Sequence, residues 1–406
     1  MYRVVLAAAV AGCGFSGRMI GAGPSDGGGG DTTTFPDGTA TDGTVATDGT
    51  SAIDGSVVAD GGMCFGTGLV RVCLTALPTS SVTLPGNTNT DGSCTQVVAQ
   101  ASGPALCVIA GTAVTVSGPV VATGSRPLVL VGTSTITISA TLDVSSNAAR
   151  TGAGANFGPI CNNTSYLAGF GEDDGGGGGG GAGGGFGTPG ATGGLGDTND
   201  NHLPTPHMGI PHAAGVQQPQ PTLLRGGCPG GPGGGGSEIA LASLGGAGGA
   251  SGGAVYLIAG NSITISGNVF ASGAGGGANP NGPGFEQGGG GGGSGGMIGI
   301  DAPAIQIDGI VAANGGAGAG GGGNVGGTAG APGSTTQYTT RAAHGVGDAT
   351  GSAGDGGDGT AINATAPPPV GSTISGGGGG GGGVGVVWID GVVGNGTKIS
   401  PPPTAH

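Results

Sequence analysis

The sequence predicts an all-β protein, built as a single parallel β-helix (solenoid) with long Gly-rich insertions. Short segments alternate β-branched residues with polar ones, which is typical of strands with one buried face. A unit of two such segments recurs at Leu128–Ile138, Val255–Ile265 and Ile298–Ile307, and Gly-rich stretches separate the copies. Because one unit cannot bury its own apolar face, we expect the copies to stack while the insertions project from one side.

Further strands are expected on both sides of these copies, within a body that spans residues 63–394. They lie at Leu69–Leu74, Ser81–Leu84, Val108–Ile109, Ala113–Val116 and Leu142–Val144. The apolar segment Val384–Asp390 is expected to close the stack. Trp388 within it is the one Trp of the chain, and we interpret it as a cap or core filler rather than a ligand-stacking ring.

Composition limits both the size of the core and the class of partner. Gly supplies 109 of the 406 residues and aromatic residues only 3%, so the apolar material suffices for one slender core. The net charge is −14, from 22 acidic and 8 basic residues, and the sequence has no basic patch. Binding to nucleic acid, or to an anionic membrane through charge, is therefore not expected.

Residues 1–13 are typical of a bacterial lipoprotein signal. Met1–Arg3 is positively charged, Val4–Ala11 is apolar, and Val10-Ala-Gly-Cys13 resembles the lipobox of that family. The resemblance implies that Cys13 carries a lipid and begins the mature protein. Gly14 after it is compatible with the outer membrane or cell surface. Every other apolar run is shorter than the roughly 18–20 residues of a spanning helix, so we expect an exported protein with a lipid anchor to the membrane.

The segments flanking the body differ from it in composition. In residues 14–62, Asp-Gly pairs recur from Asp37 to Asp60, and each pair favours a turn. The apolar residues between them are too few and too small for a stacked core, so we expect a disordered, Asp-Gly-rich stalk. Residues 395–406 are expected to form a Pro-rich tail.

The seven Cys residues are compatible with one lipid anchor and three disulfides. Once Cys13 is set aside, six remain, and an even number is expected of an exported chain. Spacing alone leaves many pairings open, and we predict that sequence neighbours pair. The predicted disulfides are Cys64–Cys73, Cys94–Cys107 and Cys161–Cys228.

The glycine tracts leave two interpretations open. Gly175–Gly181, Gly288–Gly293 and Gly376–Gly383 are uninterrupted, and the last two run directly into strand-like segments. Disordered loops are the ordinary interpretation, because Gly loses the most backbone entropy on ordering. The alternative is extended three-residue helices packed side by side, as in polyglycine II, since backbones without Cβ can approach one another closely.

Few residues are candidates for metal binding. His202, His207 and His212 form the one His cluster and, with nearby carboxylates, are weak candidates for metal ligands. Their spacing suits neither a helix nor a hairpin, and Pro residues stiffen the segment. We therefore expect neither a metal site nor a cofactor.

Two other patterns suggest binding or catalysis. Asp301 and Asp308 are a candidate carboxylate pair for polysaccharide cleavage on a β-helix groove, although no Arg or Tyr cluster lies beside them. Ice or mineral binding would need flat ranks of Thr, for which Thr135, Thr137 and Thr264 are the suggestive positions.

The body resembles glycine-rich bacterial lipoproteins and PE-PGRS-like surface proteins. The resemblance rests on Gly253–Gly267 and Gly295–Pro303. It implies an exported β-solenoid with Gly-rich insertions and no assigned enzyme activity. We therefore expect a non-enzymatic surface lipoprotein with a structural or adhesive role, whose partners are surface glycans or other cell-surface proteins. A polysaccharide-binding or polysaccharide-cleaving β-helix is the alternative.

Overall fold

The structure of the chain is a computed structural model. The described residues are 63–161, 177–197, 213, 215, 217, 221–236, 245–278, 286–323, 327–331, 333, 338–347, 353–362, 367–372, 375–394 and 398–405. The chain divides into the units Met1–Ser51 and Ala52–His406, and all described residues belong to the second. The predictions for Cys13, for the stalk at 14–62 and for His202, His207 and His212 lie outside them.

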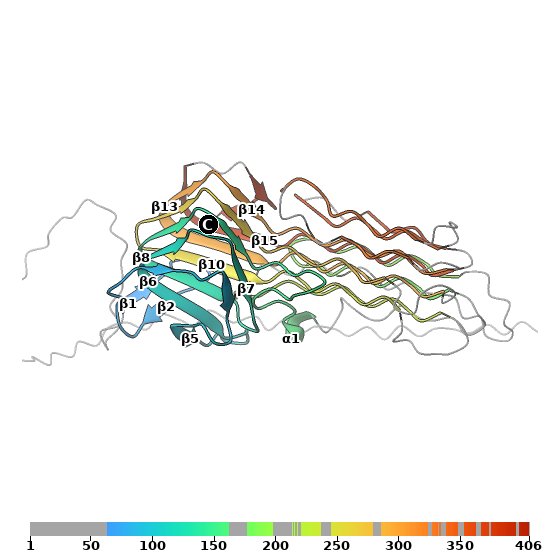
Figure 1. The fold of residues 1–406 in the computed structure, drawn as a ribbon, viewed down its shortest axis with the longest axis horizontal. Helices are drawn as coiled ribbons and strands as arrows, with labels where there is room; N and C mark the ends of the chain where they lie inside the picture. Colours follow the sequence, from blue (N-terminus) through green and yellow to red (C-terminus); the bar gives the residue numbers. More distant parts are fainter. Residues whose placement is uncertain are drawn as a thin grey trace, which may run out of the picture. The chain divides into compact units, whose positions relative to one another are not determined.

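Strands occupy one end of the described unit, and Gly-rich segments extend from them (Figure 1). The strands of the larger sheet are β3 (Val82–Thr83), β5 (Gln96–Val98), β6 (Leu106–Val116), β8 (Leu128–Ile138), β10 (Ala254–Ala259), β11 (Ser262–Ile265), β13 (Met297–Ile307), β15 (Val386–Val393) and β17 (Thr404–Ala405). Their order is β17-β15-β13-β10-β8-β6-β3, with β11 beside β8 and β13, and β5 beside β6. All of these pairs are parallel except β5 with β6.

A second parallel sheet lies against the first, and a hairpin and a short helix complete the described elements. The second sheet contains β4 (Asn87–Asn89), β7 (Val120–Thr123), β9 (Thr141–Asp143), β12 (Asn268–Phe270), β14 (Ile310–Ala312) and β16 (Ile399–Ser400). Its order is β16-β14-β12-β9-β7-β4. The hairpin pairs β1 (Met63–Phe65) with β2 (Val72–Leu74), and the helix is α1 (Gly158–Cys161).

The three repeated units lie side by side in register, as the sequence suggested. Val255 pairs with Leu128 on one side and with Ile298 on the other. Ile263 pairs with Ile136 and Ile305 in the same way. Their side chains are buried in one core between the two sheets, and burial of β-branched and Leu side chains is the main source of stability there.

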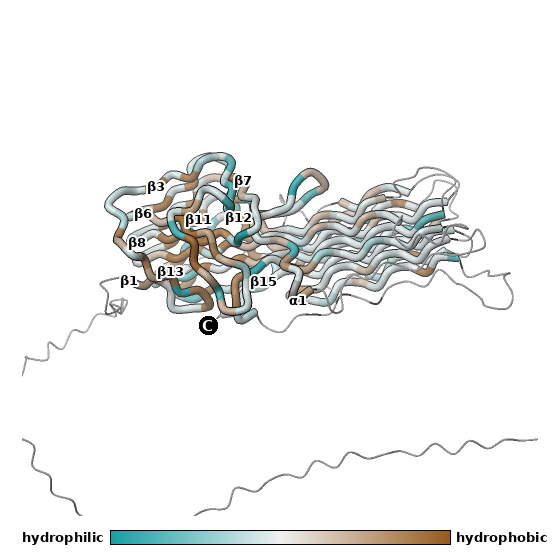
Figure 2. The backbone as a smooth tube through the Cα atoms, turned by 90° about the horizontal axis from the view of Figure 1, so that it is seen from below, coloured by the Kyte–Doolittle hydropathy of each residue, from teal (hydrophilic) through white to brown (hydrophobic). Residues whose placement is uncertain are grey.

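A second core covers the opposite face of the first half of these strands. Val129 and Tyr256 contribute to it from the sheet, and Phe65 and Leu74 from the β1–β2 hairpin. Trp388 packs against the same cluster, in agreement with its interpretation as core filler. In Figure 2 the strand region contains many hydrophobic (brown) stretches among pale and teal ones, whereas the Gly-rich segments are largely pale.

The prediction of a single parallel β-helix is wrong. β10 and β11 each pair with both β8 and β13, so these four parallel strands form a closed ring of pairings. β5 runs antiparallel, and β1–β2 forms a sheet of its own. The Gly-rich segments, predicted as insertions on the side of a column, form a hydrogen-bonded body instead. Alternation of apolar residues reveals strands, but it carries no information about pairing between glycine backbones.

The Gly-rich segments are ordered, with a hydrogen-bond period of three. Gly288, Gly291 and Ser294 donate their N–H groups to carbonyls of 228–234, whereas Gly289, Gly292 and Gly295 donate to 377–383. Every third residue therefore faces the same neighbour, as in an extended helix of three residues per turn. We call this body the glycine bundle.

The segment 288–296 lies inside the bundle, bonded on six sides. Besides the two neighbours above, it donates to 271–277 and accepts from 246–252, 181–184 and 316–319. The tract 376–385 is bonded in a comparable way, for example through Gly379 to Ala319 and Gly380 to Gly181. Glycine is required at most of these positions because neighbouring backbone atoms occupy the place of a Cβ. Ser294 is an exception, and its hydroxyl is hydrogen-bonded to the backbone of Cys228.

Segments toward the outside of the bundle carry a side chain at every third position. Pro229 and Pro232 are spaced in this way, as are Ala247 and Ala250, and all four are partly exposed or exposed. The tail predicted at 395–406 also joins the fold, because its strand β16 pairs with β14 and its strand β17 with β15.

The structure confirms the three predicted disulfides. Cys64–Cys73 closes the β1–β2 hairpin and Cys94–Cys107 ties a loop to β6. Cys161–Cys228 joins α1 to the outer bundle segment 226–236 across 67 residues.

Gly379→Ala should destabilise the protein by about 3 kcal/mol, the upper end of the cost of overpacking. A Cβ on Gly379 would meet the carbonyl oxygen of Gly290, which is backbone that cannot rotate away. Gly118→Ala is the matched control, because a Cβ there meets nothing within 4 Å. Thermal unfolding followed by circular dichroism measures both, and equal midpoints for the two variants would contradict the bundle packing.

Removing Cys161–Cys228 should cost more stability than removing Cys64–Cys73. In the chain-entropy model a loop of this length contributes about 4 kcal/mol and the short hairpin loop about 3 kcal/mol. Denaturant unfolding of the double Ser variants of each pair tests the order. A larger loss for the hairpin pair would show that strain or packing, rather than loop length, dominates.

Candidate functional site

The most chemically distinctive cluster lies where the β1–β2 hairpin covers the larger sheet. The hairpin turn places Thr67 and Gly68 beside the middle of β13 and β15. The N–H groups of Thr67 and Gly68 donate to Asp301 Oδ2 at 2.8 and 3.0 Å. The Thr67 hydroxyl lies 3.0 Å from Asp301 Oδ1 and 3.0 Å from Asp390 Oδ2.

The carboxylate pair in the structure differs from the predicted one. Asp301 pairs in register with Asp390 on the neighbouring strand β15. Asp308 lies beyond the end of β13, where its carboxylate accepts a hydrogen bond from Gln306 Nε2 at 2.8 Å. The sequence did not suggest Asp390, because that pairing depends on the register between segments that a long Gly-rich stretch separates. The Ile-Asp pair that both strands share, Ile300-Asp301 in β13 and Ile389-Asp390 in β15, was the available signal.

Burial dominates the electrostatics of this cluster. Asp301 is 4% exposed, and its removal from water raises the pKa of its carboxyl, as does the nearby charge of Asp390, while the three hydrogen bonds from Thr67 and Gly68 oppose the shift. Burial also raises the pKa of the Tyr256 hydroxyl, which accepts a hydrogen bond from the Leu69 N–H at 3.2 Å.

A cavity of about 220 Å³ adjoins the pair, between the hairpin turn and the strands β10, β13 and β15. Phe65, Ile258 and Pro303 form much of its apolar lining. Both oxygens of Asp301 already accept hydrogen bonds from the hairpin, and the same hydroxyl bridges the two carboxylates. The arrangement therefore holds the hairpin to the sheet, and it differs from an open groove with two opposed carboxylates, which glycoside hydrolysis requires.

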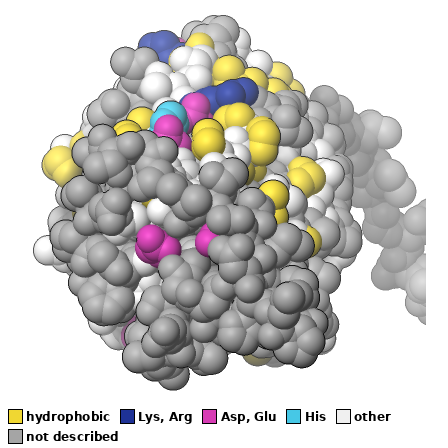
Figure 3. All heavy atoms as spheres, turned by 90° about the vertical axis from the view of Figure 1, so that its right-hand side faces the viewer, with side chains coloured by type: hydrophobic (Ala, Val, Ile, Leu, Met, Phe, Trp, Pro, Cys, Tyr) yellow, Lys and Arg dark blue, Asp and Glu magenta, His cyan; other side chains and the backbone are white. Residues whose placement is uncertain are grey.

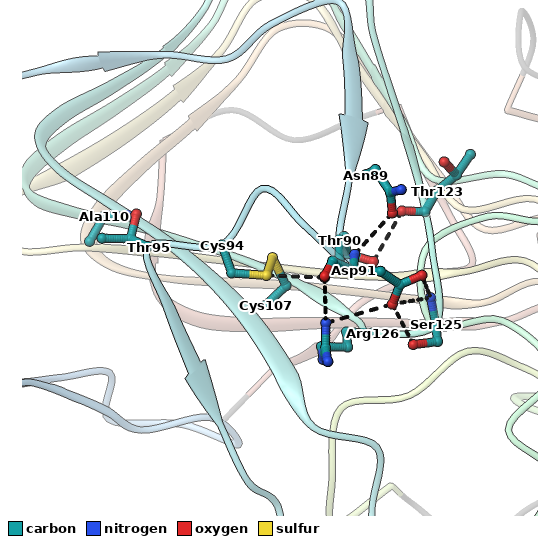
Figure 4. Close-up of a disulfide and its surroundings, with 10 residues drawn as sticks. All are labelled: Asn89, Thr90, Asp91, Cys94, Thr95, Cys107, Ala110, Thr123, Ser125 and Arg126. Carbon is teal, nitrogen blue, oxygen red and sulfur yellow. Dashed lines mark hydrogen bonds and ion pairs between the residues drawn. A yellow bond between two sulfur atoms is a disulfide. The ribbon is translucent and has the colours of Figure 1, made fainter.

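A second polar cluster surrounds the Cys94–Cys107 disulfide (Figure 4). The Asp91 carboxylate accepts hydrogen bonds from the Ser125 hydroxyl and N–H, at 2.5 and 3.1 Å. Arg126 Nη1 donates to the carbonyl oxygens of Thr90 and Asp91 at 3.1 and 3.2 Å. The Ser125 hydroxyl, together with the Ser125 N–H and the Arg126 charge, lowers the pKa of Asp91. These contacts fix the loop between β4 and β5.

Arg225 lies beneath the Cys161–Cys228 disulfide as a buried cation. Its guanidinium stacks 4.4 Å from the centre of the Phe186 ring and donates to the Gly226 carbonyl at 3.1 Å. Burial lowers the pKa of Arg225 to about 10. The Phe186 ring and the Cys161–Cys228 disulfide together anchor the start of the outer bundle segment 226–236.

The predicted Thr positions lie in register on the outer face of the larger sheet. Thr137 on β8 pairs with Thr264 on β11 and with Thr115 on β6. Two residues earlier on the same strands, Thr135 pairs with Ser262 in a second row. Each such row of paired residues across the strands is called a rank. We call the outward side chains of the two ranks that contain Thr137 and Thr135 the hydroxyl face.

The end of the glycine bundle has a mixed surface. Leu195, Val346 and Val370 are exposed there, and His344 Nδ1 lies 2.6 Å from Asp358 Oδ1. Figure 3 shows hydrophobic side chains interspersed with acidic and basic ones on this side. The described side chains form no patch of a single sign in this view.

The described residues offer no other strong candidate site. They contain no group of three or more His, Cys, Asp or Glu side chains that could hold a metal ion. Within the same residues, no helix has the length and apolar character needed to cross a membrane. Comparison of the chain with models of protein families, with curated proteins and with solved structures finds no match.

The pKa of Asp301 predicts a specific pH dependence of stability. Because its folded-state value lies above the unfolded value of about 3.9, the folded protein holds this proton more tightly. The resulting stabilisation is complete below the unfolded pKa and is lost as the pH rises through the folded pKa. Relative to wild type, Asp301→Asn should therefore gain in melting temperature as the pH is raised from 4 upward.

Asp308→Asn is the control, because it removes an exposed carboxylate just after the end of β13. The pH trend of Asp301→Asn is compared with the trend of this variant. A constant difference between wild type and Asp301→Asn would contradict the raised pKa.

Proposed function

We propose that the chain is a non-enzymatic, exported surface protein with a structural or adhesive role, held to the outer membrane or cell surface by a lipid on Cys13. The observation that carries the proposal is the glycine bundle, whose inner tracts 288–296 and 376–385 are hydrogen-bonded to neighbours on all sides. Such a bundle is a densely hydrogen-bonded body, and it suits the spacing or presentation of surfaces.

The disulfides support export. All six Cys residues that the structure describes are paired, and disulfides of this kind persist in oxidising compartments and are rare in the cytosol. Proteins outside the cell also face proteases and unfolding without chaperones. Three covalent links, one of them spanning 67 residues, limit the unfolded ensemble in that setting.

The outer surface of the bundle supports an adhesive role. Side chains emerge from outer segments at every third residue, for instance Asp355 and Asp358 on one segment and Thr192 and Leu195 on another. A regular backbone thus displays varied side chains in fixed rows. Many weak contacts along such rows add up when the partner is extended, as a glycan or another surface protein is.

The anchor is tested by mass spectrometry of the protein expressed in a bacterium that processes lipoproteins. The mature chain should begin at Cys13 and carry a diacylglyceryl group, and it should fractionate with membranes. Cys13→Ala should release it to the soluble exported fraction, whereas Ser16→Ala, a change just after the anchor, should leave it on the membrane. An unmodified N-terminus elsewhere in the chain would refute the anchor.

Catalysis is tested separately with the purified full chain and a panel of polysaccharides. We expect no release of reducing sugars above that of a heat-denatured sample. A different outcome would establish a polysaccharide-cleaving enzyme in place of the proposed role. In that outcome the wild-type chain releases reducing sugars, Asp390→Asn abolishes the release, and Asp308→Asn leaves it intact.

A further inference from the structure

The hydroxyl face is a regular array of short polar side chains. Its first rank runs in register across neighbouring parallel strands, each residue opposite the next. The members are Thr83, Thr115, Thr137, Thr264 and Gln306. A second rank, two residues earlier on each strand, consists of Ala113, Thr135, Ser262 and Ala304. Neighbours within a rank are about 4.8 Å apart, and the two ranks are about 7 Å apart.

These side chains face solvent. Thr83, Thr137 and Gln306 are exposed, and Thr115 and Thr264 are partly exposed. None of the side chains in the two ranks is charged or aromatic. Solvent-facing positions of natural sheets commonly carry Lys or Glu, which hold water in irregular, ion-centred shells. The face presents only methyl, hydroxyl and amide groups to water.

The array is also rigid. Between the two ranks, Ile136, Ile263 and Ile305 point the opposite way and are at most 2% exposed in the main core. Thr is β-branched, so its χ1 angle is restricted, and neighbours on both sides restrict it further. The hydroxyl positions are therefore fixed before any ligand arrives, which reduces the entropic cost of binding.

From this geometry we infer that the hydroxyl face binds the surface of ice. A single hydroxyl contact with water is weak, but contacts that form together add their free energies when the partner has a matching repeat. Crystalline water offers oxygen atoms in a flat lattice with a repeat close to the spacing within a rank. The methyl groups of Thr fit between those oxygens without displacing hydrogen bonds.

Other extended ligands fit the face less well. Glycans are usually bound by aromatic rings, by charged groups or by both, and the two ranks contain neither. A charged mineral would require a matching charged surface. The inference goes beyond the proposed function and does not depend on the lipid anchor, because it concerns the isolated chain.

The test uses the purified full chain, with disulfides formed, in a nanolitre osmometer and in an assay of ice recrystallisation. We expect faceted ice crystals, a gap between melting and freezing points, and small grains after annealing. Thr137→Lys, in the middle of the first rank, should raise the protein concentration needed to inhibit recrystallisation by about tenfold or more, since a bulky charge there disrupts a central contact.

Thr141→Lys is the matched control, because Thr141 is a partly exposed strand residue of the second sheet. It should retain wild-type activity, and melting temperatures should show that both variants fold. Thr137→Val, which keeps the shape and loses the hydroxyl, should fall between wild type and Thr137→Lys.

Three results would overturn the inference. They are the absence of ice shaping and recrystallisation inhibition in the wild-type protein, equal activity of wild type and Thr137→Lys, and an equal loss in Thr141→Lys. Binding to crystalline cellulose or chitin by a wild-type protein without ice activity would assign the face to a glycan instead.

Discussion

The fold depends on hydrogen bonds between backbone segments of the same chain. These segments consist mostly of glycine, so no side chains hold them apart. In water a glycine tract loses more conformational entropy on ordering than any other sequence of its length. Isolated, such a tract would stay disordered. In the bundle each residue of 288–296 exchanges hydrogen bonds with surrounding segments, and each bond contributes about 1 kcal/mol net. Order therefore arises only when all neighbours are present together, which makes the bundle cooperative.

The two parallel sheets supply the alignment that the bundle cannot provide for itself. Glycine carries no pattern that distinguishes one register from another, whereas a strand of alternating Ile and Thr does. Three bundle segments pass directly into strands, at Gly253 before β10, Gly296 before β13 and Gly385 before β15. The hydrogen bonds from Met297 N to Gly253 O and from Val386 N to Gly296 O continue the ladder of the sheet into the bundle. The apolar cores thus determine the register of the glycine segments.

The sequence predicts the parts of this fold that depend on local pattern. The alternation in Ile136-Thr-Ile138 and Ile263-Thr-Ile265 identified strands, and their similarity identified neighbours. Spacing alone left the disulfide pairing open, and the assumption that sequence neighbours pair agrees with the structure. The topology as a whole was predicted wrongly, because β5 and the β1–β2 hairpin show no feature that distinguishes antiparallel from parallel pairing.

The candidate site shows the same limit. The sequence alone led to the pairing of Asp301 with Asp308, the nearest carboxylate along the chain. The true neighbour, Asp390, lies on the next strand after a Gly-rich stretch, and Thr67 reaches the pair from a hairpin more than two hundred residues away in sequence. Contacts of this kind depend on the order of strands in the sheet, and no spacing rule within the sequence specifies that order.

The threefold repeat of the bundle also restricts how such a gene can change. Insertion or deletion of one codon within a tract would turn every later residue by a third of a revolution, so that backbone donors would face the wrong neighbours and outward side chains would point inward. Gain or loss of three codons would preserve every facing relation and alter only the length of a segment. Repetitive glycine codons are prone to slippage during replication, and in this architecture only slippage by whole turns would be tolerated.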